Sequence, residues 1–103
     1  MSRLNIQEAF VAERRLTILR ILLEVREAVP DVAMMHALHA TARRVKVDRE
    51  AVREDYKFLE ELMCVTTDLV DDRVLEATIT SRGALAAQGN IKIPGVADAL
   101  LER

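Results

Sequence analysis

The sequence contains a single cysteine, Cys64, and this scarcity excludes two kinds of structure. One thiol has no partner within the chain for a disulfide bond, and a zinc site built on cysteine needs two to four thiolates at close spacing. A disulfide scaffold and a cysteine-based zinc module are therefore excluded, and the composition favours a reducing compartment.

Long apolar runs and a strong excess of charge of either sign are also missing. Runs such as Ile21-Leu22-Leu23 are far shorter than the roughly 18 residues that a membrane span needs, and the N-terminal region lacks a secretory apolar segment. The formal net charge is −2, so any attraction to nucleic acid has to come from a local basic patch. We expect a cytoplasmic protein that does not bind membranes.

Motifs of enzyme active sites are absent from the sequence as well. It contains no glycine-rich phosphate loop, no nucleophile elbow and no His-Glu-x-x-His motif. His36 and His39 share a predicted helix, but no cysteine pair or carboxylate cluster completes a metal site with them. We therefore expect no enzymatic activity, no metal, no cofactor and no small-molecule ligand.

The apolar residues that are present suit one domain over residues 1–103, because half of the chain is hydrophobic. The pattern predicts a first helix from about residue 7 to 28, within the segment 1–29. Val29-Pro30-Asp31 ends it, since proline has no amide to donate and restricts the residue before it. A second helix is expected from about residue 32 to 42, and a third, capped by Asp48, from Arg49 to about Met63.

The second half of the chain predicts a hairpin and a closing helix. Two β-rich runs, residues 65–70 and 74–80, flank the short polar turn Asp71-Asp72-Arg73. Thr80 is a suitable N-cap for a following helix, and Gly89 is a suitable left-handed residue at its end. Residues 97–103 read as a helix-like tail.

This order predicts a mainly α fold with a β-hairpin wing, that is, a winged helix-turn-helix. The helix-turn-helix covers residues 32–63, the wing residues 65–80, and the closing helix and tail residues 81–103. The stretch from Val47 to Leu62 resembles the recognition-helix pattern of bacterial winged-helix regulators of the ArsR and DeoR type. Ile79-Thr80-Ser81-Arg82-Gly83 resembles the junction at which such domains leave the wing.

A narrower resemblance covers nearly the whole chain. The run from Glu13 to Arg20, the helix-turn-helix, the wing exit and Ile93-Pro94-Gly95-Val96 together resemble a family of small winged-helix proteins from Mu-like phages and prophages. The resemblance implies a winged-helix fold and a phage-related context. Residues 97–103 depart from the basic, proline-containing end of that family, so it implies no role for the tail.

The third helix is predicted to carry any DNA readout. Arg49, Arg53 and Lys57 follow one another at i, i+4 and i+8, and guanidinium groups suit both phosphate oxygens and guanine. The basic turn before this helix is suited to phosphate, and Arg73 lies at the wing tip. The predicted DNA-binding residues are Arg43, Arg44, Lys46, Arg49, Arg53, Lys57 and Arg73.

Acidic residues leave an alternative open. Glu50, Glu54 and Glu61 flank the basic stripe, so its cations can instead be paired on a solvated helix face. The wing adds four further acids around Arg73, namely Asp68, Asp71, Asp72 and Glu76. We therefore predict a regulator that binds double-stranded DNA, with a protein-interaction module of phage development that binds no DNA as the alternative.

Asp55 falls in the apolar arc of the third helix and is predicted to be buried. A buried carboxylate requires ionic or hydrogen-bond partners. The expected partners are Arg43, Arg44 or the backbone amides at the beginning of the second helix. The role predicted for Asp55 is structural.

The first helix carries more apolar residues than one core requires. Leu16, Leu19, Leu22 and Leu23 form one face, while Ile18, Ile21 and Val25 lie to its side and Phe10 extends the apolar surface. Such a surplus usually marks an interface, so a homodimer joined through the first helix is expected. In the monomeric alternative, Leu100 and Leu101 cover part of this surface.

Overall fold

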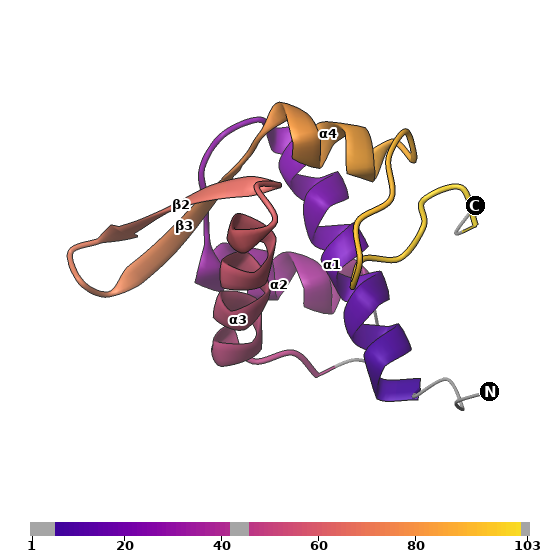
Figure 1. Cartoon of the computed structure of the whole chain (residues 1–103). Helices are drawn as coiled ribbons and strands as arrows, with labels where there is room; N and C mark the ends of the chain where they lie inside the picture. The colour runs from indigo at the N-terminus through magenta and orange to yellow at the C-terminus, as the bar shows by residue number, and fades with distance from the viewer. Residues whose placement is uncertain (1–5, 42–45, 102–103) are drawn as a thin grey trace.

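The computed structural model describes residues 6–41 and 46–101, which form four helices and a three-stranded antiparallel sheet (Figure 1). The elements in chain order are α1 (Ile6–Val25), β1 (Val29–Pro30), α2 (Asp31–Thr41), α3 (Arg49–Glu61), β2 (Val65–Val70), β3 (Val74–Ile79) and α4 (Ser81–Ala87). The predicted combination of helices with one hairpin is confirmed. Within the described ranges, no helix is long and apolar enough to cross a membrane.

The β2–β3 hairpin projects from a body made by the helices (Figure 1). Its register runs from Val65 opposite Ile79 to Val70 opposite Val74, in agreement with the predicted hairpin. The turn carries two residues with positive φ, Asp71 at 53° and Asp72 at 56°. The amide of Arg73 donates to the carbonyl of Val70 at 3.0 Å and closes the turn.

The sheet contains one strand that the sequence analysis missed. β1 pairs with β3 through Val29 opposite Ala77 and Pro30 opposite Glu76, so the strand order is β1-β3-β2. A proline fits here because β1 is an edge strand, where one amide is not needed for pairing. α1 ends at Val25 rather than near residue 28, and Arg26 with φ 59° turns the chain toward the sheet edge.

The middle of α1 is buried more completely than predicted. Leu16, Leu19 and Leu22 lie in the core as expected, and Ile18, which was placed on a surplus flank, is fully buried too. Ile21 and Leu23 are partly buried against the same core. The premise that one domain cannot bury the apolar residues of α1 is therefore wrong for the centre of the helix.

The segment after α4 contributes to this burial by lying along α1 (Figure 1). The amide of Ala97 donates to the carbonyl of Ala12 at 3.1 Å, and Arg20 donates to the carbonyl of Ala99 at 3.3 Å. Ala99 is buried, whereas Leu100 and Leu101 are exposed. The prediction of a helix-like tail is wrong for residues 97–101, because residues 97 and 98 are irregular and residues 99–101 form a turn. Residues 102 and 103 lie outside the described part.

The junction between β3 and α4 depends on Thr80 and Gly83. The hydroxyl of Thr80 accepts a hydrogen bond from the amide of Gly83 at 3.1 Å and donates to the carbonyl of Met63 at 2.7 Å. Gly83 packs so closely on the main chain of Cys64 that an added Cβ would overlap the Cys64 carbonyl oxygen. After the helix, Gly89 has φ +82°, so the predicted cap and stop are both confirmed.

Helix α3 begins as predicted and ends two residues early. The side chain of Asp48 accepts from the amide of Ala51 at 2.8 Å, which is the expected N-cap bond. Met63, where the helix was predicted to end, lies beyond the helix with φ 61° and an exposed side chain.

Candidate nucleic-acid interface

Arg49 and Arg53 do not form the open stripe that the sequence predicted. Both guanidinium groups point to the beginning of α2, where Nε of each lies close to Oδ2 of Asp31, at 3.1 Å for Arg49 and 2.6 Å for Arg53. Asp31 is fully buried, while the arginine side chains remain 42% and 27% exposed. The two arginines therefore bind a buried carboxylate and still reach the surface.

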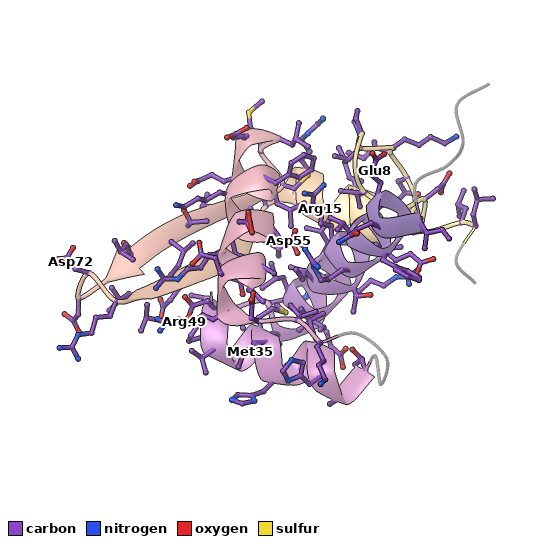
Figure 2. All side chains as sticks on the ribbon, turned by 90° about the horizontal axis from the view of Figure 1, so that it is seen from below. Glu8, Arg15, Met35, Arg49, Asp55 and Asp72 are labelled. Atoms are coloured by element: carbon purple, nitrogen blue, oxygen red, sulfur yellow. The ribbon has the colours of Figure 1, made fainter. Side chains whose placement is uncertain are left out.

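The same two guanidinium groups also contact the hairpin. Nη2 of Arg49 and Nη2 of Arg53 each donate to the main-chain oxygen of Arg73. Arg49, Glu50, Arg53 and Arg73 together line a hollow of about 320 Å³ between α3 and the hairpin. We call this hollow the arginine pocket. Figure 2 shows Arg49 at the edge of α3, and Asp72 farther out at the end of the hairpin.

Asp31 is the residue of this site that the sequence analysis missed. It also accepts hydrogen bonds from the amide of Val32 at 2.7 Å and from the amide of Leu75 at 3.3 Å. Its position as the first residue of a helix directly after a proline was a usable signal, because acidic side chains bind free amides there. Asp31 thus connects α2, α3 and β3.

The protonation equilibrium of Asp31 follows from these contacts. Burial raises the pKa of its carboxyl group, but the hydrogen bonds from Arg53, Arg49 and the two amides outweigh burial and hold the pKa below its usual value. Burial, together with the negative charge of Asp31, raises the pKa of the nearby Tyr56, whose hydroxyl donates to the carbonyl of Val29 at 2.9 Å. Asp31 is therefore ionised at neutral pH, and Tyr56 is neutral.

We expect Asp31 to make stability depend on pH in the acid range. Its folded-state pKa is lower than in the unfolded chain, so its contribution is complete above the unfolded value of about 4 and is lost as the pH falls through the folded value. In urea unfolding, Asp31→Asn should be less stable than the wild type at pH 7, and the difference should be smaller at pH 3. A difference that stays constant over this range would contradict the assignment.

The outward stripe of α3 is acidic rather than basic. Its exposed side chains at i, i+4, i+7 and i+11 are Glu50, Glu54, Lys57 and Glu61. We call these four residues the acidic stripe. Arg49 and Arg53 leave this face because their side chains turn inward to Asp31, while the buried side of the helix, with Asp55, is the predicted one. Lys57 is exposed as predicted, but it stands among three carboxylates.

The remaining predicted DNA-binding residues lie in different places. Lys46 is exposed just before α3. Arg43 and Arg44 lie outside the described residues. Of the hairpin acids, Asp68, Asp71 and Asp72 are exposed, and so is Arg73. The structure therefore brings Arg49, Arg53 and Arg73 together and leaves Lys57 on the acidic stripe.

Asp55 is fully buried as predicted, but its partners belong to α1. Oδ2 lies 2.5 Å from Nε of Arg14, and Oδ1 lies 3.1 Å from Nε of Arg15. Arg15 also stacks on the ring of Phe58 at 3.6 Å and donates to the carbonyl of Gly95 at 3.2 Å. Of the expected partners, Arg43 and Arg44 lie outside the described residues, and the carboxylate binds α1 instead of the amides at the beginning of α2. Figure 2 shows this contact between α1 and α3 at Arg15 and Asp55.

The histidine pair has ordinary helix-surface geometry. The ring centroids of His36 and His39 are 6.4 Å apart, and Nε2 of His39 lies 2.6 Å from the carbonyl oxygen of Val47. In the part of the chain that the structure describes, no three His, Cys, Asp or Glu residues are grouped to hold a metal ion. The absence of a metal or cofactor stays a prediction.

Scans of protein-family models, curated proteins and solved structures gave no match to this chain. The resemblance to winged-helix proteins of Mu-like phages, which rests on short sequence motifs, stays a prediction.

Proposed function

We propose that this protein is a phage-related winged helix-turn-helix regulator that acts in the cytoplasm by binding double-stranded DNA. α2 and α3 correspond to the helix-turn-helix, and the β2–β3 hairpin corresponds to the wing. The observation that carries the proposal is the arginine pocket. It joins Arg49 and Arg53 of α3 with Arg73 of the hairpin, although these residues are distant in the sequence.

The chemistry of the pocket supports an anionic ligand. A guanidinium group has five N–H donors. The contacts of Arg49 and Arg53 described above use one Nε and one Nη2 donor of each, so donors on the outer side of both groups can still bind phosphate oxygens. Asp31 and the Arg73 carbonyl hold the two guanidinium groups in fixed positions before a ligand arrives.

Binding to a short duplex of mixed sequence, measured by fluorescence anisotropy over a salt series, tests the proposal. We expect binding at about 50 mM salt that weakens steeply toward about 200 mM, because each phosphate contact releases counterions. Each contact adds about 0.9 to the slope of log affinity against log salt concentration. Absence of binding at low salt would contradict DNA binding.

A second function is favoured by one observation. The acidic stripe and the exposed hairpin acids Asp68, Asp71 and Asp72 give the outer face of α3 and the hairpin a negative charge. Such a face repels the DNA backbone and suits a basic protein surface. If the duplex assay shows no binding, an interaction module of phage development becomes the better proposal.

The proposed dimer uses the N-terminal end of α1 instead of its buried centre. Ile6 and Phe10 are exposed there, the latter by 55%. The same end of α1 contributes Val11 to a hollow of about 570 Å³, which Phe58, Pro94 and the charged residues Glu8 and Arg15 also line. Two copies related by a two-fold axis would each place an apolar side chain in the hollow of the other.

Light scattering at micromolar concentration tests this arrangement. We expect a dimer mass for the wild type and a monomer mass for Phe10→Glu, because a charge at the centre of an apolar contact is strongly unfavourable. Leu85→Glu on α4 is the matched control, since Leu85 is also exposed but lies on another element. A wild-type monomer mass that does not change on dilution would remove the dimer.

A further inference from the structure

We infer that the arginine pocket holds a single phosphate group of the duplex backbone and that α3 does not read base edges, so that the protein binds duplex DNA with little regard to base sequence. The inference rests on the proposed function and specifies its ligand. Its basis is the placement of the charged residues of α3. Arg49 and Arg53 turn inward to Asp31, whereas the acidic stripe is exposed.

The inner side of α3 is built for an anion of limited size. Asp31 and the Arg73 carbonyl hold Arg49 and Arg53 in place. The two arginines border a hollow of about 320 Å³, and Glu50 lines its edge on the side of the acidic stripe. A phosphate group carries several acceptor oxygens and can accept from two guanidinium groups at once. Because the lining comes from α3 and the hairpin turn, a phosphate held there lies between these two elements.

The outer side of α3 is unsuited to base readout. Specific contacts in the major groove are made mainly by Arg, Lys, Asn and Gln, whereas a carboxylate can only accept, chiefly from the amino group of cytosine. Glu50, Glu54 and Glu61 occupy three of the four positions of the acidic stripe. The negative potential of the DNA groove would repel these three carboxylates. Lys57 lies among them, so it could not enter the groove without bringing them close to the DNA.

Binding of a phosphate in the pocket would also affect the position of the hairpin relative to α3. The two guanidinium groups that border the hollow are the groups that donate to the Arg73 carbonyl. A phosphate bound to them therefore also fixes the hairpin turn relative to α3. Arg73 lines the same hollow and its side chain is exposed, so its guanidinium group is free to turn toward a phosphate bound there.

The test uses the full chain, a short mixed-sequence duplex and inorganic phosphate as the two probes. For the duplex, we expect Arg73→Ala to weaken binding about tenfold and to reduce the salt slope by about one, uniformly for competitor duplexes rich in A·T or in G·C. Lys92→Ala is the matched control, because it removes one positive charge from a residue of the segment after α4. Thermal unfolding of both variants should match the wild type.

A second arm separates the duplex backbone from free phosphate. Inorganic phosphate should shift the NMR signals of Arg49, Arg53 and Arg73, and the shifts of Arg49 and Arg53 should need a higher phosphate concentration in Arg73→Ala. Such shifts without any duplex binding would overturn the DNA ligand but retain a phosphate site. Duplex binding that strongly prefers one sequence, and loses the preference in Lys57→Ala, would overturn the inference while DNA binding stands. Absence of both interactions would overturn the pocket itself.

Discussion

Replacement of Asp55 with alanine is expected to lower the free energy of unfolding by about 3 kcal/mol, within the range for breaking a buried ion pair. Asp55 is fully buried, and its loss leaves the guanidinium groups of Arg14 and Arg15 without their shared carboxylate. The cost falls at the lower end of that range because both arginine side chains retain some contact with water. In thermal unfolding this corresponds to a decrease in Tm on the order of 10 °C.

Glu54→Ala is the control for Asp55→Ala, because Glu54 is the preceding residue of α3 and is exposed. Its Tm should stay close to that of the wild type. The double variant Arg14→Ala, Asp55→Ala should lose less stability than the sum of the two single variants, since they remove the same contact. A wild-type Tm for Asp55→Ala would show that α3 does not pack on α1 through this residue.

Replacement of Gly83 with alanine is expected to destabilise the fold by about 3 kcal/mol, although helix propensity alone favours alanine over glycine by about 1 kcal/mol. The added Cβ would overlap the main-chain oxygen of Cys64 and lie 2.9 Å from Cγ1 of Ile79. The overlapped atom belongs to the backbone, so no side-chain rotation relieves the contact. Urea unfolding shows whether the substitution lowers or raises the free energy of unfolding. A decrease means that the overlap with Cys64 dominates, and an increase means that helix propensity dominates.

Ser81→Ala provides the matched comparison for Gly83→Ala. Ser81 is the first residue of α4 and is exposed, so the substitution changes helix propensity without adding a buried contact. We expect its stability to change by less than about 0.5 kcal/mol. An increase in stability for Gly83→Ala would mean that α4 lies farther from Cys64 than the structure shows.

Local signals in the sequence predicted most of the secondary structure. The N-caps Asp48 and Thr80 and the left-handed Gly89 act through bonds and dihedral angles within a few residues, and the structure has each where the pattern placed it. The short β1 strand was missed because two residues carry no periodicity. It exists through its pairing with β3, which lies far away in the sequence.

The candidate site was only partly predictable for a related reason. The sequence indicated that Asp55 is buried, since that follows from its place on the helix, but the partners Arg14 and Arg15 depend on how α1 packs on α3. Asp31 draws Arg49 and Arg53 inward from another element, and this reverses the charge expected on the outer face of α3. Helical periodicity has no information on such contacts between elements.

The position of the segment after α4 has a consequence for biosynthesis. Contacts such as that between Arg15 and the carbonyl of Gly95 join residues 80 positions apart. α1 leaves the ribosome before the other elements of this fold, and the main chain that lies along it is translated only after α2, α3, the hairpin and α4. Until that segment is made, the side of α1 that carries Ala12, Arg15 and Arg20 lacks part of its final cover and is available to chaperones.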